Sequence, residues 1–287
     1  MSGNYVQAPY NYSAIFGAWV NEIAMMRIAV VTPYYKEPIE KLRRCHDSVL
    51  NQTHPEVMHF MVADGFPRVE IDSWERCLHF PLPLGHNDSG DTPRAVGCSS
   101  AAAQQFDGIV LLDADNWFEP GHIEVMLRVH SQSQAPVVTC ARTLRRPDTG
   151  EALAICWESD GIKFCDTNCY LIMDSAFPLL AAWGFRDKKT SIRIANMGDR
   201  LFWNAVARSK VRRAHSSKPT VNYETAWAAH YAALGLPIPD FAKVIVWLPA
   251  EQRFRLVSYD EYRQFVEQGL IKPEPFDSCV NGKPEGL

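Results

Sequence analysis

The chain has 287 residues, of which 47% are hydrophobic and 22% charged, and its formal net charge is −4 at pH 7. This length can bury the core of one large domain or two small ones, and the composition is that of an ordinary globular protein. The acidic balance argues against a nucleic-acid binder that works through a general basic field. The sequence has no apolar stretch near the roughly 20 residues that cross a bilayer, so we expect no integral membrane segment.

The first 26 residues lack the charged start, apolar core and small-residue cleavage site of a secretory signal. We treat them as an N-terminal extension and expect a cytoplasmic protein. The eight cysteines are scattered along the chain without the spacing of a disulfide framework, which favours reduced thiols. Cys165 and Cys169 lack the further pair that would complete a zinc site.

The predicted elements of the first half alternate between strands and helices. In chain order they are a strand at 27–32, a helix from about 39 to 49, strands at 57–63 and near 77–80, a helix ending near 103, a strand at 109–112, a helix near 120–130 and a strand at 137–141. Apolar residues at helical spacing, such as Ile39, Leu42 and Val49, indicate the first helix. This alternation predicts an α/β fold with a central, mainly parallel sheet flanked by helices.

Beyond about residue 142 the pattern changes and becomes mixed. Short strand-like segments are predicted at 152–157, 162–164 and 170–173, and helices near 175–183, 199–208 and 224–234. We find no repeat and no clear linker, so we prefer one compound domain. Its parts are a first half at 27–141, a second half at 142–240 and a C-terminal tail at 241–287.

The most informative segment is Gly-Ile-Val-Leu-Leu-Asp-Ala-Asp-Asn at residues 108–116. The apolar run indicates a buried strand, and it ends in Asp113 and Asp115. Because side chains alternate along an extended chain, both carboxylates project to the same side. Open α/β sheets bind ligands at the carboxyl ends of their strands, and paired carboxylates attract a hard divalent cation. The alternative is a polar turn that only ends the strand.

Two other predicted strands also end in polar residues, Thr-Pro-Tyr-Tyr at 32–35 and Asp-Gly at 64–65. In a doubly wound sheet these ends share one edge with Asp113 and Asp115, and Arg94 enters from the loop before the second helix. Carboxylates and an arginine in one cleft suit a nucleoside diphosphate with its metal ion. The sequence has neither a phosphate-loop lysine motif nor a Gly-x-Gly-x-x-Gly turn.

These motifs resemble the opening of the family 2 glycosyltransferases, which have the GT-A fold and use nucleotide-sugar donors. The resemblance rests on Val-Val-Thr-Pro-Tyr-Tyr-Lys-Glu, Ser-Val-Leu-Asn-Gln-Thr and Ala-Asp-Gly between residues 28 and 65, and on the Asp-Ala-Asp strand end. Met-Gly-Asp-Arg-Leu-Phe-Trp at 197–203 looks like the acidic motif that precedes a helix in the family. Asn-Tyr-Glu-Thr at 222–225, followed by His230 and Tyr231, is similar to the spore-coat polysaccharide branch. The resemblance covers about residues 27–235.

The resemblance implies a role for individual residues. Asp199 is the general base that deprotonates the acceptor hydroxyl, and Asp115 is the direct ligand of Mn²⁺ or Mg²⁺. His230 is a last metal ligand or a pyrophosphate contact. The nucleotide contacts are assigned to Thr32, Pro33, Tyr34, Glu37, Asp64, Arg94, Asp113 and Ala114.

The implied activity is inverting transfer of a sugar from a nucleoside diphosphate donor, most simply a UDP sugar. The acceptor is a carbohydrate or another hydroxyl-bearing molecule, and homo-oligomers are compatible with the sequence. The first half would bind the nucleotide sugar, and the second half would bind the acceptor. Direct displacement by the acceptor inverts the anomeric centre and needs no protein nucleophile.

The sequence departs from the family pattern in three places. A single acid, Asp64, follows Ala63 where the family has two, and Gly198 stands where an acid usually precedes Asp199. The Gln-x-x-Arg-Trp motif of processive polysaccharide synthases is missing, which argues against such a synthase. Asp199 also has an alternative as a helix N-cap, Arg94 as an exposed first-turn residue and His230 as a packing residue.

Other functions remain open at this stage. The chain could be a non-catalytic nucleotide-sugar-binding protein or a nucleotidyltransferase similar to the sugar-nucleotide pyrophosphorylases. The latter normally opens with a Gly-rich loop and a lysine, which this chain replaces with Thr-Pro-Tyr-Tyr-Lys. A phosphatase of the haloacid dehalogenase type is disfavoured because its Asp-x-Asp follows the first strand.

Overall fold

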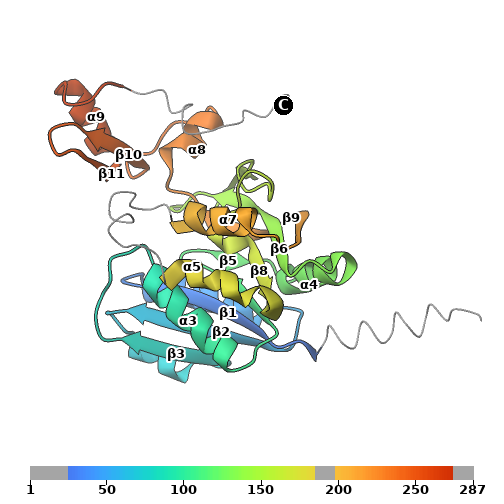
Figure 1. Cartoon of the computed structure of the whole chain (residues 1–287). Helices are drawn as coiled ribbons and strands as arrows, with labels where there is room; N and C mark the ends of the chain where they lie inside the picture. The colour runs from blue at the N-terminus through green and yellow to red at the C-terminus, as the bar shows by residue number, and fades with distance from the viewer. Residues whose placement is uncertain (1–24, 185–197, 274–287) are drawn as a thin grey trace, which may run out of the picture.

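The computed structural model describes residues 25–184 and 198–273. Its main body is a mixed sheet with helices on both faces, and a smaller C-terminal unit projects from it (Figure 1). Among the described helices, none combines the length and the apolar character that crossing a membrane would require.

The sheet has the strand order β3-β2-β1-β4-β8-β6-β9-β5, and β7 pairs with β6. Strands β3, β2, β1 and β4 are all parallel, β8 runs antiparallel to both of its neighbours, and β9 is parallel to β6. The strands are β1 (Ile28–Tyr34), β2 (Val57–Asp64), β3 (Cys77–Leu82), β4 (Gly108–Leu111), β5 (Trp117–Phe118), β6 (Val137–Arg145), β7 (Ala152–Ile155), β8 (Tyr170–Met173) and β9 (Arg213–Glu224).

The two central parallel strands are covered on both faces. Every residue of β1 and of β4 is buried. Strands in this position cannot alternate between core and solvent, which is why their sequences are continuous apolar runs. The burial fixes these strands firmly and thereby positions the loops that follow them.

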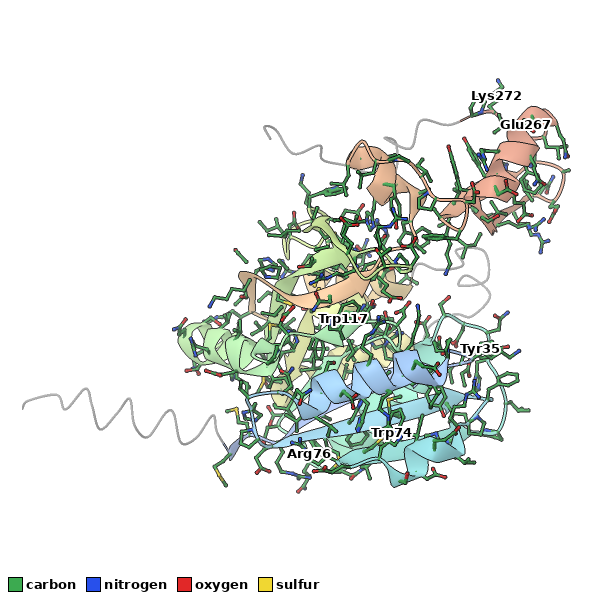
Figure 2. The ribbon with its side chains drawn as sticks, turned by 180° about the vertical axis from the view of Figure 1, so that it is seen from behind. Tyr35, Trp74, Arg76, Trp117, Glu267 and Lys272 are labelled. Atoms are coloured by element: carbon green, nitrogen blue, oxygen red, sulfur yellow. The ribbon has the colours of Figure 1, made fainter. Side chains whose placement is uncertain are left out.

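Helix α3 (Asp91–Ala103) lies on one face of this parallel part, with α5 (Ala181–Gly184) beside it, and α2 (Ile39–Leu50) covers the opposite face (Figures 1 and 2). Gly97 allows α3 to approach closely, because a Cβ at this position would lie 2.5 Å from Cγ1 of Val31. The remaining helices are α4 (His122–Ser133), α7 (Gly198–Arg208), α8 (Ala228–Ala233) and α9 (Tyr259–Glu267), and the 3₁₀ helices are η1 (Val69–Ser73), η2 (Thr167–Cys169) and η3 (Asp174–Leu180).

The alternating first half agrees with the predicted elements apart from small shifts at their ends. The second half differs more. The strand predicted at 162–164 does not form, and the helix predicted at 175–183 is the 3₁₀ helix η3 followed by the short α5. Strand β9 was not predicted. The helix predicted near 224–234 is the shorter α8, which begins at Ala228.

The segment predicted as a C-terminal tail contains folded elements in its described part. Strands β10 (Lys243–Leu248) and β11 (Arg253–Ser258) form an antiparallel hairpin, and α9 follows it. Val244, Val246 and Tyr262 belong to a hydrophobic cluster separate from the main core. The other face of the hairpin is exposed, and it carries Ile245, Trp247, Phe254 and Leu256.

Candidate functional site

A cavity of about 320 Å³ lies where the carboxyl ends of β1, β2 and β4 meet. Tyr35, which follows β1, lies at this edge of the molecule (Figure 2). Parallel strands present their carboxyl ends at the same edge, so the sheet order itself assembles the cavity. Of the residues predicted to bind nucleotide or metal, those that line it are Pro33, Tyr34, Glu37, Asp64, Arg94, Asp113, Ala114 and Asp115.

Thr32 is not among the lining residues. Its side chain is fully buried, and its hydroxyl lies 2.8 Å from Nε2 of His59 on the neighbouring strand. The structure therefore places the Thr32 side chain inside the sheet packing, next to the cavity wall but not in it.

Asp64 is held by the loop that follows β3. Its carboxylate accepts hydrogen bonds from the backbone N–H of His86 at 3.0 and 3.1 Å, and Nδ1 of the same residue lies 2.6 Å away. The next residue, Gly65, has φ of +81°, and a Cβ there would lie 2.3 Å from the backbone nitrogen of Gly85. Only glycine permits this close approach, which fixes the direction of Asp64.

Arg94 is buried between two carboxylates. Its Nη2 lies 2.7 Å from Oδ1 of Asp113, and its Nη1 lies 3.3 Å from Oδ1 of Asp91. The guanidinium also lies 4.6 Å from the ring centroid of Trp183. Since only 4% of Arg94 is exposed, the alternative of a solvent-exposed first-turn residue is wrong.

Asp113 is fixed by Asn168 as well. The backbone N–H of Asp113 donates to Oδ1 of Asn168 at 2.6 Å, and Nδ2 of Asn168 donates to Asp113 Oδ2 at 2.9 Å. Asn168 is fully buried in η2, far along the chain. Both oxygens of Asp113 therefore have a defined direction at the cavity.

Asp115 lies among carboxylates. Burial, with Asp113 and Glu224 close by, raises its pKa to about 7. Glu224, at the end of β9, is itself bound by Lys41 and by Arg44, whose Nη1 lies 2.7 Å from Oε1. Helix α2 supplies both cations, and Arg44 also lies over the ring of Trp117, which Figure 2 shows beside that helix. Crowded carboxylate oxygens of this kind fit a hard divalent cation, which would offset their repulsion.

A second cavity of about 300 Å³ adjoins the first, and Arg94, Asp113 and Asp115 line both. Asp199, at the start of α7, lies in the second cavity. Its Oδ1 accepts a hydrogen bond from the backbone N–H of Arg200 at 2.7 Å. Burial, together with the negative charge of Asp166, raises the pKa of Asp199 to about 6. A carboxylate with this pKa is ionised at neutral pH and is a better base than an ordinary aspartate.

Gly198 brings another acid to this cavity. A Cβ on Gly198 would lie 2.6 Å from Oδ1 of Asp91, which is 2% exposed and comes from α3. The glycine where the resemblance leads us to expect an acid therefore makes room for the carboxylate of Asp91. Asp91 has no sequence signal of its own, because it reaches the site from a different helix.

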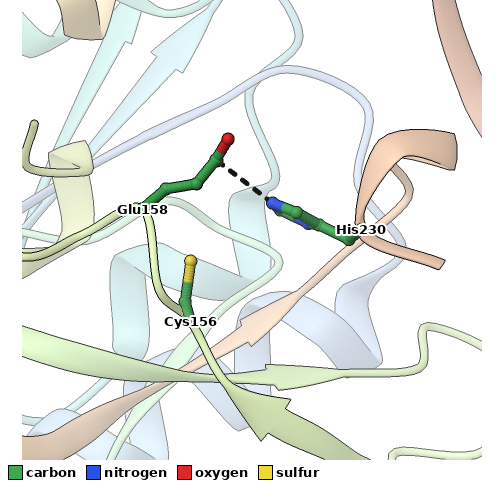
Figure 3. A group of neighbouring side chains, drawn as sticks. All are labelled: Cys156, Glu158 and His230. Atoms are coloured by element: carbon green, nitrogen blue, oxygen red, sulfur yellow. Dashed lines mark hydrogen bonds and ion pairs between the residues drawn. The ribbon is translucent and has the colours of Figure 1, made fainter. Parts of the chain in front are cut away.

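His230 lines neither cavity. Its Nδ1 lies 2.5 Å from Oγ1 of Thr225, and its Nε2 lies 3.2 Å from Oε2 of Glu158. The structure thus groups His230 with Glu158 and Cys156 and does not bring it into the cavity wall with Asp115 (Figure 3).

The sequence analysis missed several charged residues of the second cavity. Arg142 and Asp166 form a buried ion pair, and the Arg142 guanidinium lies 3.9 Å from the ring centroid of Tyr223. Asp166, Tyr223 and Glu224 line this cavity. Arg142 lies on β6, Tyr223 and Glu224 lie on β9, and Asp166 precedes η2, so only the packing of these elements brings the residues together.

Comparisons with known proteins find similarity in structure only. No protein-family model matches the chain, and no curated protein matches it in sequence. The crystal structure of S. aureus TarS 1–349 in complex with UDP is similar, with a TM-score of 0.52, 12% identity, and coverage of 73% of this chain and 63% of that chain. The complex of TarS 1–349 with UDP-GlcNAc gives a TM-score of 0.51 and 13% identity, covering 70% and 59%.

This chain therefore spans less than two thirds of those TarS chains. At this identity the likeness shows the fold, which is a GT-A-like α/β fold with a large, mostly parallel sheet and flanking helices. The predicted fold class is confirmed. The predicted placement in the spore-coat branch receives no support from these matches.

Proposed function

We propose that this protein is an inverting glycosyltransferase that moves a sugar from a nucleoside diphosphate donor, a UDP sugar, to a hydroxyl-bearing acceptor. The observation that carries the proposal is the pair of adjoining cavities that share Arg94, Asp113 and Asp115, with Asp199 in the second one. Sugar transfer needs a donor and an acceptor bound in neighbouring spaces, with charged groups where the two spaces meet. The TarS complexes with UDP and UDP-GlcNAc support the choice of uridine.

The first cavity is suited to the nucleotide. Tyr35 lies in its wall and packs edge to face on Phe66, and Lys36 lies over both rings. An aromatic wall suits a base, and the fixed carboxylate of Asp64 accepts hydrogen bonds from N–H groups such as the one in the uracil ring. Arg94 supplies the positive charge that a diphosphate needs.

Asp115 and Asp113 are the residues that would hold Mn²⁺ or Mg²⁺. When bound, a divalent cation neutralises the negative charge that develops on the leaving diphosphate. Burial, together with the proximity of Asp113 and Glu224, raises the pKa of Asp115, and this proximity favours a metal-binding role because the carboxylates repel one another without a cation.

Asp199 takes the proton from the acceptor hydroxyl as that oxygen attacks the anomeric carbon. It faces the second cavity, whose wall also includes Trp227, the residue before α8, and Lys243 from the hairpin. Inversion follows from a single displacement, in which the acceptor and the leaving diphosphate lie on opposite sides of the sugar. A non-catalytic binding protein would not need a base with a raised pKa at this position.

The acceptor approaches across the C-terminal hairpin. Leu256 lines the second cavity, and it pairs with Ile245 on the exposed face of the hairpin. Trp247 and Phe254 form the next pair along the same face, with ring centroids 5.0 Å apart. This aromatic face continues from the cavity and suits stacking against the rings of a carbohydrate acceptor.

A panel of nucleotide sugars tests the proposal. With manganese present, we expect one UDP sugar to be hydrolysed slowly, which chromatography of the released UDP would detect, and a panel of glycans to accelerate the release. Absence of both binding and release across uridine, guanosine and thymidine diphosphate sugars would overturn the assignment. Release of pyrophosphate from a sugar phosphate and a nucleoside triphosphate would instead support the nucleotidyltransferase alternative.

A further inference from the structure

Cys156, Glu158 and His230 form a cluster of potential metal ligands outside both cavities. One ligand atom from each residue lies within 4.8 Å of the others. Cys156 and Glu158 come from the segment after β7, and His230 comes from α8 (Figure 3). In the described part of the chain, these residues form a group of three His, Cys, Asp or Glu side chains that could hold an ion.

The histidine is oriented for ligation. Its Nδ1 is engaged by the Thr225 hydroxyl at 2.5 Å, which leaves Nε2 directed at Glu158. A hydrogen bond to the second ring nitrogen is the usual way in which proteins fix the tautomer and direction of a metal-binding histidine. Trp157 packs edge-on against the ring and restricts it further.

The cysteine supplies a second observation. Cys156 is 4% exposed and is a free thiol that forms no disulfide. Figure 3 shows the sulfur directed toward the space between Glu158 and His230.

We propose that Cys156, Glu158 and His230 bind a zinc-class transition metal ion. Sulfur, imidazole nitrogen and one carboxylate form a donor set that favours zinc over magnesium or manganese. Asp113 and Asp115 provide oxygen alone and suit the harder ions. A water molecule completes the coordination on the side where Glu158 keeps 20% of its side chain exposed.

The metal joins two segments that are distant in the sequence. It ties the segment after β7 to α8, the helix that precedes the hairpin bearing Lys243 and Leu256. Its role is to fix the base of that hairpin, and it does not depend on any nucleotide or sugar.

Cobalt is a suitable probe because cobalt bound to a thiolate absorbs in the near ultraviolet. Added to the full chain after treatment with a chelator, Co²⁺ should give this band at one equivalent, and Zn²⁺ should abolish it. Cys156→Ser should remove the band, whereas Cys98→Ser, which removes a buried thiol elsewhere, should keep it. A wild-type protein without the band, or a band that survives in Cys156→Ser, would overturn the proposal.

Two further variants separate this site from the donor site. Thr225→Val keeps all three ligands and should weaken zinc binding about 10–100-fold, the usual effect of losing an outer-shell partner. Asp115→Asn should keep the cobalt band while losing any response to manganese. A band lost in Asp115→Asn would show that cobalt binding depends on the carboxylate site and would refute an independent site at Cys156, Glu158 and His230.

Discussion

The two cavities are built in different ways. The first is assembled from residues at or just beyond the carboxyl ends of parallel strands, such as Pro33, Asp64 and Asp115, and each belongs to a short local motif. The second combines Asp166, Tyr223 and Leu256 from elements spread over the last half of the chain. The comparison teaches that sheet order alone can assemble the proposed nucleotide pocket, whereas the proposed acceptor pocket depends on long-range packing.

The largest expected effect separates chemistry from donor binding. Asp199→Asn should lower kcat about 10²–10⁴-fold, the usual contribution of a positioned base. Donor affinity measured by calorimetry should stay unchanged, because Asp199 lies outside the first cavity. Asp148→Asn, which changes an acid of the exposed turn after β6, is the matched control. Loss of donor affinity with intact turnover would mean that Asp199 contributes to donor binding and is not the catalytic base.

Asp115→Asn is expected to lose the manganese-dependent part of donor binding. Manganese should increase the donor affinity of the wild type at least about tenfold, or about 1.4 kcal/mol. The same titration should show no manganese effect in the variant, because its main oxygen ligand is gone. An unchanged manganese response would remove Asp115 from the metal site.

Helix α3 is common to both cavities, so a change in its packing should affect both. A Cβ at Gly97 would clash with Val31, and we expect Gly97→Ala to destabilise the fold by about 1–3 kcal/mol, as overpacking does. Urea unfolding measures this change. Gly121→Ala is the control, since no atom lies within 4 Å of a Cβ there. Equal stability of the two variants would mean that α3 can shift freely.

The pH dependence of kcat should report Asp199. Burial raises the pKa of this carboxyl to about 6, so the base is ionised above this pH and protonated below it. The rate should therefore rise with pH up to about 6 and fall about tenfold for each unit below it. A profile that stays flat down to about pH 4, the region of an ordinary aspartate, would argue against a buried base.

The smallest effect concerns the hairpin face. Trp247→Ala should raise the KM for the acceptor about two- to tenfold, which corresponds to the 0.5–1.5 kcal/mol of an aromatic contact. The KM for the donor should not change, because the hairpin does not line the first cavity. Glu267→Ala, which changes an exposed residue at the end of α9, is a control. An equal rise for both substrates would show a general loss of structure.

The sequence predicted the first half well because its signals are local. An apolar run followed by Asp113 and Asp115 identifies both a strand and the side chains that it presents. Arg94 could be placed near the cleft from its predicted position in a loop before a helix; in the structure it lies in the first turn of α3, and its burial between Asp91 and Asp113 could not be read from the sequence. That burial depends on the close packing that Gly97 allows.

The second half was predicted less well because its strands lack a clear pattern. Strand β9 is largely polar and contains Pro219, a residue that disfavours central strands. In the structure the register between β6 and β9 shifts on both sides of Ala141, the partner of Pro219, and this irregularity accommodates the proline. The hairpin was treated as a tail because several prolines flank it, although β10 alternates between exposed and buried residues.

The separate core of the hairpin unit has an evolutionary consequence. Val244, Val246 and Tyr262 pack among themselves, so substitutions on the outer face around Trp247 leave the strand ends of the main sheet undisturbed. If the hairpin binds the acceptor as proposed, preference for one acceptor can diversify by surface change in this unit while the first cavity stays the same.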